Sequence, residues 1–421
     1  MSWLCNKGKD FTVAKNTIAL ITREALNKGV LFVLLVLIGR FLGKEALGRY
    51  SLAIAISQIF FFGTELGLNT LLIREVAKEK LLAGKALFNI GILRIVLGLL
   101  TMLLIWLTAV IIGAKDETAT VIYLCGISYF IISITTVFTS IFRAFEKMEL
   151  ELFIAVIKNV IFLPLAIWAL FCNGSLIAIF NIFLATNILA LIISGVIFIR
   201  QIEIPKFKLD FRFLKAQGKE TWPIWIGQLF GIAYLKVAPL LLFRLKGEGA
   251  VGLYNAGFVV VDGLWVLATC FVSSIFPVIS RLNAVSQHDS KVEYLKGLRF
   301  IFLVFLPLGA ILILAAPYLV RILYGGKFDE IVPLFRLLTV VAILIALDTH
   351  NGLSILAIGK QFVFPFINGA GLIINFILSM FFILRFSYIG SAYALIISEF
   401  FVFILMMAVL KRSFSKPRMV K

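Results

Sequence analysis

Single charged residues stand inside long apolar segments of this 421-residue sequence, among them Lys158, Lys236, Asp348 and Glu399. A charge inside a membrane is costly unless water, an opposite charge or a ligand compensates it, so such residues are functional candidates. A lysine of this kind can bind an anion, whereas a carboxylate can bind a cation or a proton. For each residue, an internal ion pair or a position close to the membrane boundary is the alternative explanation.

Depth within the apolar segment separates stronger candidates from weaker ones. Arg94 and Arg336 are expected near the ends of their segments, where a long side chain can reach the interface. Lys158 and Lys236 are expected deeper. We therefore take Lys158 and Lys236 as candidate contacts for an anion.

The first apolar segment carries several polar residues in its first half. Asn16, Arg23 and Asn27 follow at intervals of seven and four, which places them on one face of a helix. Glu24 and Lys28 are four residues apart and can pair. An interfacial segment with snorkelling side chains is one interpretation, and a polar face in a water-filled cavity is the other. The second interpretation adds Arg23 and Lys28 to the candidate cations.

Two later segments carry polar faces at corresponding places. The first face is formed, at intervals of seven, seven and four, by Ser51, Gln58, Glu65 and Asn69. The matching positions of the second face are Asn255, Asp262, Thr269 and Ser273. Hydrogen bonds between helices would explain such faces, but we favour a shared central cavity. Gln58 and Asn255 are then candidate substrate contacts. The candidate coupling carboxylates are Glu65, Asp262, Asp348 and Glu399.

A repeated motif relates the two polar faces. The pattern Arg-x-x-Gly-x-x-Ala-x-Gly-x-Tyr occurs at Arg40–Tyr50 and again at Arg244–Tyr254. Two shorter matches follow in the same order: Ala144–Lys147 with Ala357–Lys360, and Gly174–Ala178 with Gly390–Ala394. The repeats predict a tandem duplication of a half of roughly 200 residues, with Arg40 equivalent to Arg244 and Tyr50 to Tyr254.

The composition predicts an all-α, polytopic membrane protein. Hydrophobic residues make up 62% of the chain and charged residues 15%, whereas soluble domains have about 25% charged residues. Twelve transmembrane helices in two homologous six-helix bundles are expected. Their approximate ranges are 17–41, 51–72, 87–112, 120–142, 151–171, 176–199, 222–243, 251–277, 298–323, 333–357, 363–384 and 390–410.

The domain organisation follows from these ranges. We expect an N-terminal six-helix lobe at 1–199, a cytoplasmic interfacial linker at 200–220, a C-terminal six-helix lobe at 221–410 and a basic cytoplasmic tail at 411–421. In the linker, Asp210 would cap a short helix that ends at Gly218. The basic residues of the linker would contact lipid headgroups; they are Lys206, Lys208, Arg212 and Lys215.

The net charge of +18 is explained by topology rather than by nucleic-acid binding. With a cytoplasmic N-terminus, most lysines and arginines outside the spans fall on one side, as expected of cytoplasmic loops. Both termini would then be cytoplasmic. The exception is the first outer turn, with Arg40, Lys44 and Arg49. No cleaved signal peptide, disulfide framework, metal site or cofactor site is indicated.

Short motifs connect the chain to a known family. They are Gly-x-Tyr at Gly48 and Gly252, and the segments 65–68, 73–78 and 276–281. Together they resemble the Wzx-type polysaccharide-repeat flippases of the multidrug and oligosaccharidyl-lipid exporter superfamily. The resemblance implies translocation of a polyprenyl-diphosphate-linked oligosaccharide across the cytoplasmic (inner) membrane for surface polysaccharide biosynthesis. The implied partners are the bilayer, the lipid-linked glycan and the glycan polymerase machinery.

Three other function classes were compared with a flippase. No phosphate-binding loop is present in the sequence, which argues against an ATP-driven pump. A cation-coupled drug or metabolite antiporter of the same superfamily is the alternative, and it would use the membrane carboxylates. A membrane-embedded glycosyltransferase or polymerase would need a large polar loop, and the loops here are short. We therefore expect a transporter that works by alternating access, and not an enzyme.

Overall fold

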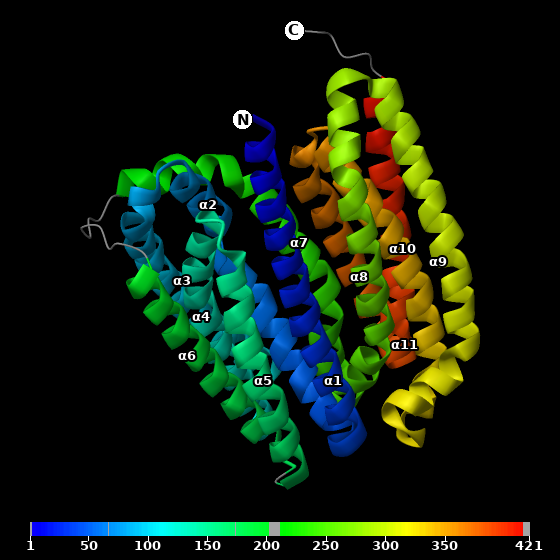
Figure 1. Ribbon diagram of the computed structural model, residues 1–421. Helices are drawn as coiled ribbons and strands as arrows, with labels where there is room; N and C mark the ends of the chain where they lie inside the picture. Colours follow the sequence, from blue (N-terminus) through cyan, green and yellow to red (C-terminus); the bar gives the residue numbers. More distant parts are fainter. Residues whose placement is uncertain (1, 66, 173, 202–210, 416–421) are drawn as a thin grey trace. The chain divides into compact units, whose positions relative to one another are not determined.

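The computed structural model describes residues 2–65, 67–172, 174–201 and 211–415 (Figure 1). In these residues every regular element is a helix, which confirms the all-α prediction. The short 3-10 helices of the protein are η1 (Lys80–Leu82), η2 (Gly326–Ile331) and η3 (Gln361–Val363). The α-helices are α1 (Ser2–Glu65), α2 (Leu68–Lys78), α3 (Ala83–Ile112), α4 (Asp116–Ala144), α5 (Met148–Cys172), α6 (Leu176–Gln201), α7 (Phe211–Lys246), α8 (Glu248–Val285), α9 (Gln287–Tyr324), α10 (Val332–Ala357) and α11 (Phe364–Ser415).

Ten helical segments in the described ranges are long and apolar enough to cross a membrane. Many of their large apolar side chains point outward, including Leu303, Leu314 and Phe366, which are 75%, 76% and 77% exposed. Hydrocarbon solvates such side chains without cost, and each helix satisfies its own backbone hydrogen bonds. The helices are therefore those of a multi-pass membrane protein.

The two longest helices are each interrupted by one residue with nonhelical geometry. Gly43 breaks α1 at φ 86° and ψ −175°, and Ser387 breaks α11 at φ 51° and ψ −136°. Both breaks fall where the sequence predicts a turn between two spans. Two predicted pairs of spans thus form single interrupted helices, and the count of twelve spans stays a prediction.

The chain divides into two compact units, and α1 contributes to both. The first unit contains 1–42 and 52–225, and the second contains 43–51 and 226–421. The division into lobes 1–199 and 221–410 stays a prediction. Of the predicted linker, residues 202–210 with Asp210 lie outside the described residues. The predicted helix end at Gly218 is wrong, because α7 continues through this residue to Lys246.

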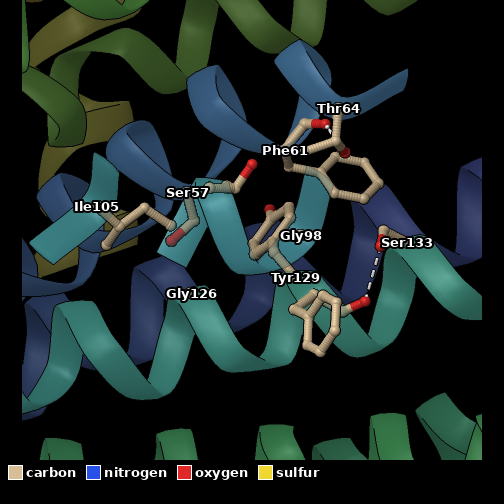
Figure 2. Close-up of a pocket in the computed structure, with 10 residues that line it drawn as sticks. Ser57, Phe61, Thr64, Gly98, Ile105, Gly126, Tyr129 and Ser133 are labelled. Carbon is tan, nitrogen blue, oxygen red and sulfur yellow. Dashed lines mark hydrogen bonds between the residues drawn. The ribbon is translucent and has the colours of Figure 1, made fainter. Parts of the chain in front are cut away.

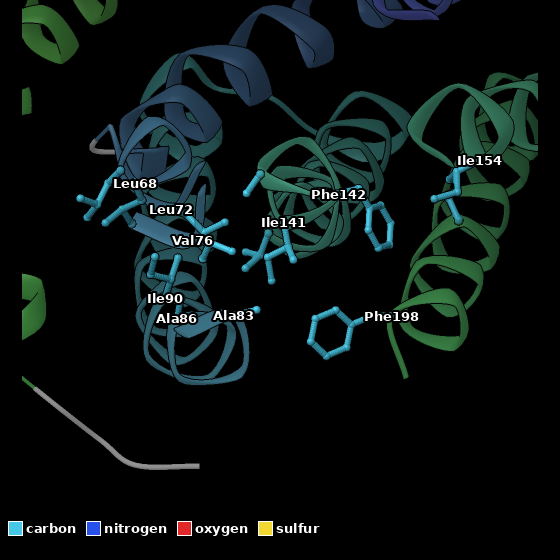
Figure 3. Packing of buried hydrophobic residues seen from close by; sticks show 14 residues of the cluster. Leu68, Leu72, Val76, Ala83, Ala86, Ile90, Ile141, Phe142, Ile154 and Phe198 are labelled. Carbon is cyan, nitrogen blue, oxygen red and sulfur yellow. The ribbon is translucent and has the colours of Figure 1, made fainter. Parts of the chain in front are cut away.

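The core of the first unit lies where α2, α3 and α4 meet (Figure 3). Leu72, Ile90 and Ile141, one from each helix, are completely buried there. In hydrocarbon, helix association depends on close packing rather than on the hydrophobic effect. At the C-terminal end of the short helix α2, the hydrogen bond from Lys78 holds the pKa of Glu75 below its usual value.

The duplicated motif has the same backbone conformation in both copies. Gly43 and Gly247 have φ values of 86° and 85° and ψ values of −175° and −177°. This region of positive φ is readily accessible only to glycine. The spacing shared by the two copies thus reflects a structural requirement. The tyrosines of the motif, Tyr50 and Tyr254, are both buried.

The two copies also contact each other reciprocally within the second unit. A Cβ atom at Gly48 would overlap the carbonyl oxygen of Glu248, and one at Gly252 would overlap that of Lys44. The repeat offset relates Gly48 to Gly252 and Lys44 to Glu248, so the contact is symmetric. Only glycine allows the two backbones to approach so closely.

Ion pairs surround this contact and involve two of the three cations that are the exception to the predicted charge distribution. Arg49 binds Glu248 with an Nε–Oε2 distance of 2.6 Å, and Lys44 binds Glu330 with an Nζ–Oε1 distance of 3.0 Å. Each of these two cations is therefore balanced by a carboxylate of the second unit.

The second motif pair also forms matching turns, whereas the third does not. Phe145 and Ile358 both have φ −89° and ψ 5°, and each is followed by a residue with positive φ. In the third pair, Gly174 has φ 57° in a turn, but Gly390 lies inside α11 beyond the break at Ser387. Two of the three motif pairs thus share local geometry, and superposition of the complete halves stays a prediction.

Replacing Gly252 tests the close backbone contact. Gly252→Ala is expected to destabilise the protein by about 1–3 kcal/mol, because the added methyl group forces the two backbones apart. Gly263→Ala is the matched control, since it lies in the same helix and its added Cβ meets no atom within 4 Å. Thermal unfolding of the purified variants in detergent gives the melting temperature of each. Equal melting temperatures of the two variants would contradict the contact.

Candidate functional site

A polar interface joins α1 and α5 inside the first unit. Arg23 of α1 donates a hydrogen bond to the carboxylate of Glu151 and another to Glu24. One turn further along α1, Asn27 accepts a hydrogen bond from Asn159, with an Nδ2–Oδ1 distance of 2.7 Å. Two residues of the predicted polar face, Arg23 and Asn27, thus contact α5.

Glu151 links this interface to the end of α4. Arg143 donates from Nε to Oε2 at 2.7 Å and from Nη2 to Oε1 at 2.8 Å, which is a bidentate ion pair. The Glu151 side chain is only 2% exposed. Sequence reasoning missed Glu151, because it lies one turn into its helix, where a carboxylate is usually solvated.

Lys158 lies on the same face of α5, two helical turns beyond Glu151. Its side chain is half-buried, and in the part of the chain that the structure describes no carboxylate forms an ion pair with it. Its charge is instead repelled by that of Arg23. The structure therefore brings together two predicted cations, Arg23 and Lys158, whereas Lys28 is exposed on α1.

Arg94 is a second buried cation of this unit, and its predicted position near a helix end is wrong. It lies well inside α3 and is completely buried. Its Nη2 atom donates to Oδ1 of Asn69 at 2.7 Å, and Asn69 in turn donates to Glu65. Among the described residues, Nε and Nη1 of Arg94 have no hydrogen-bond partner. Glu65 is thus placed between the charges of Arg94 and Arg143.

The middle of the first polar face borders a narrow pocket between α1, α3 and α4 (Figure 2). Gln58 donates to the Tyr129 hydroxyl at 3.2 Å, a bond between helices. The pocket has room for about one water molecule, so it is too small for a sugar or a lipid headgroup. Its lining residues are Ser57, Phe61, Thr64, Gly98, Thr101, Ile105, Gly126, Tyr129, Phe130 and Ser133.

Two carboxylates approach each other inside the second unit. Asp348 of α10 and Glu399 of α11 are 8% and 4% exposed, and each lies within the electrostatic reach of the other. Tyr234 of α7 lies beside Glu399, and its hydroxyl is 3.0 Å from Oγ of Ser398. Two buried carboxylates at short range disfavour double ionisation, so the pair suits a shared proton or a bound cation.

The other predicted residues of this unit are Lys236, Asn255 and Asp262. Lys236 lies with Nζ 5.9 Å from the ring centre of Phe258 of α8, a cation–π contact. Asn255 donates to the carbonyl oxygen of Val251 in its own helix at 3.0 Å. Asp262 is exposed on α8. Lys236 is therefore placed beside the helix that carries Asn255 and Asp262.

His350 is a buried residue that sequence reasoning did not select. Its ring stacks on that of Tyr294, with ring centres 5.2 Å apart, and Nε2 lies 3.0 Å from the Tyr294 carbonyl oxygen. The Tyr294 hydroxyl donates to Oδ1 of Asn351 at 2.8 Å. Asn351 follows Asp348 by three residues in α10, so these polar groups extend from the carboxylate pair towards α9.

Removal of the buried Arg94 charge tests its structural role. Arg94→Met is expected to destabilise the protein by about 3–5 kcal/mol, since it removes one of the two cations that flank Glu65. Combining it with Glu65→Gln should restore part of this loss. Arg336→Met is the control because this arginine is exposed on α10. Equal melting temperatures for the Arg94 and Arg336 variants would show that Arg94 is not needed for packing.

A sequence comparison identifies one matching family. The model of the family described as polysaccharide biosynthesis protein matches residues 13–283. This range covers more than half of the chain. No curated protein sequence matches it.

Solved structures with the same fold are transport proteins. An inward-facing multidrug resistance MATE family transporter of the MOP superfamily is 16% identical, with a TM-score of 0.77, and the match covers 94% of this chain and 99% of that chain. Lipid II flippase MurJ, in an inward closed conformation, is 18% identical with a TM-score of 0.72, covering 96% and 89%. An outward-facing MATE family transporter is 15% identical with a TM-score of 0.62, covering 96% and 95%. At these identities the likeness establishes the fold.

Proposed function

Because this chain belongs to the polysaccharide biosynthesis protein family and has the fold of MOP-superfamily transporters, we propose that it flips a polyprenyl-diphosphate-linked oligosaccharide. The cargo would cross from the cytoplasmic to the outer leaflet of the inner membrane, for surface polysaccharide biosynthesis. The observation that carries this substrate class is the cationic site formed by Arg23 and Lys158 in a membrane helix bundle. A fold neighbour that is a lipid II flippase supports a lipid-linked cargo.

The chemistry of the site fits a diphosphate attached to sugars. Phosphoryl oxygens form strong, charge-assisted hydrogen bonds with arginine and lysine. The neighbouring amides of Asn27 and Asn159 can donate to and accept from sugar hydroxyl groups. The prenyl tail would remain in the hydrocarbon, where it needs no protein contact.

The transport cycle we propose is alternating access between two six-helix lobes with twelve spans in total. Both termini would be cytoplasmic, as the distribution of lysine and arginine indicates. A glycan polymerase on the outer side would consume the product. The protein itself would form no covalent bond with its cargo, and we class it as a transporter.

Substitution of Lys158, in the cationic site, and of Lys236, the second predicted anion contact, tests whether these charges act on the substrate. Lys158→Ala and Lys236→Ala should each abolish glycan export without loss of membrane insertion, and Arg should restore more export than Gln, because charge is required. Surface glycan and the lipid-linked repeat units on the cytoplasmic leaflet are measured in a strain that lacks the chromosomal gene. Lys291→Gln, at an exposed position, is the control. Normal export by the Gln variants of both lysines would contradict a cationic site at these residues.

A cation-coupled antiporter is the second candidate, favoured by the buried pair Asp348 and Glu399. The pair would bind a proton or a small cation, and its loading could be coupled to transport in either mechanism. The two candidates differ in cargo, a lipid-linked glycan in one and a drug or metabolite in the other.

Neutral variants of the carboxylate pair test the coupling role. In proteoliposomes with an imposed proton or sodium gradient, Asp348→Asn combined with Glu399→Gln should eliminate the gradient-driven part of transport and leave binding of cargo intact. Asp289→Asn, at an exposed carboxylate of α9, is the control. A double variant that responds to the gradient as the wild type does would exclude the pair from coupling.

A further inference from the structure

A carboxylate of the protein already occupies the cationic site of the first unit. Glu151 accepts hydrogen bonds from Arg23 of α1 and from Arg143 of α4. We propose that Glu151 is an internal counter-ion, which the anionic headgroup of the substrate must displace from Arg23. This inference rests on the proposed function and concerns the regulation of the same site.

The two arginine contacts of Glu151 differ in what they hold together. Arg143 is eight positions away, across the turn between α4 and α5, and its bidentate contact closes that turn. Arg23 is 128 positions away and joins two separate helices. Arg23 also has a second carboxylate, Glu24, whose side chain is 53% exposed. Arg23 can therefore leave Glu151 while Glu151 stays paired with Arg143.

Lys158 supplies the other side of the proposed anion site. Seven residues of helix place it about 10 Å along α5 from Glu151, on the same face. Arg23 repels it, and the described chain offers it no ion-paired carboxylate. A diphosphate carries negative charge on two phosphoryl groups, so it can bridge two cations and remove this repulsion. Glu151 does not do so, because in the described part of the chain its ion pairs are with Arg23 and Arg143 and not with Lys158.

Competition for Arg23 then couples occupancy of the site to the packing of α1. Without substrate, the Arg23–Glu151 ion pair joins α1 to α5. A bound diphosphate would form an ion pair with Arg23 instead, and the link between α1 and α5 would be broken.

Removing the negative charge of Glu151 tests the displacement. Glu151→Gln is expected to bind farnesyl diphosphate about tenfold more tightly than the wild type, because the probe no longer competes with a charged hydrogen-bond partner. Lys158→Gln is expected to weaken binding about tenfold, alone and in combination with Glu151→Gln. Isothermal titration calorimetry of the full-length protein in nanodiscs measures the dissociation constants.

Glu149→Gln is the matched control. This carboxylate is also in the first turn of α5 and also forms an ion pair, with Lys15, but its side chain is 40% exposed, against 2% for Glu151. It should bind the probe as the wild type does. Melting temperatures establish that each variant is folded. Where Glu151→Gln does not fold, Glu151→Asp replaces it, because it keeps the charge for Arg143 and withdraws it from Arg23 by one methylene group.

The outcomes separate this inference from the proposed function. Tighter binding by the Glu151 variant, with no change for Glu149→Gln, supports the internal counter-ion. Unchanged or weaker binding by the folded Glu151 variant, with normal binding by the wild type, overturns it and leaves the proposed function standing. Absence of binding to the wild type and to every folded variant overturns the proposed substrate class and the counter-ion together.

Discussion

The ion pairs of Glu151 with Arg23 and Arg143 fix how three helices of the first unit meet. In an apolar medium, a charge is tolerated only where another charge or a dipole compensates it, so the partners must stay together wherever the helices pack. The same constraint places Glu65 and Asn69 against the buried Arg94. Lys158 departs from this pattern, because among the described residues no carboxylate forms an ion pair with it. Under the proposed function, the anionic headgroup of the cargo would compensate this charge.

Local spacing was sufficient to predict much of the fold. Apolar runs located the helices, and the duplicated motif located two glycines with the same left-handed backbone. The interruptions were harder to predict, because a helix can resume directly after one nonhelical residue, as it does at Gly43 and Ser387. Gly218 shows the opposite case. A glycine permits a helix end but does not require one, and α7 continues on both sides of Gly218.

The site was predicted in part. Periodicity placed Arg23 and Asn27 on one face of a helix, and both do contact α5. It could not identify their partners, because Glu151 and Asn159 are more than a hundred positions away and nothing in local spacing encodes that pairing. Hydropathy likewise misjudged Arg94, since it measures the average character of a segment and not the burial of one side chain. The approach of Asp348 to Glu399 could not be predicted either, because it depends on how α10 packs against α11 and not on local spacing.

The reciprocal contact of Gly48 with Glu248 and of Gly252 with Lys44 has an implication for the history of the chain. Equivalent residues that contact each other across a local twofold relation are the defining property of an isologous interface, the kind that joins identical subunits. A single-copy ancestor carrying this motif would have used it to form a homodimer. Gene duplication would then have converted a contact between two chains into one within a chain, and the glycines would be a remnant of that older quaternary structure.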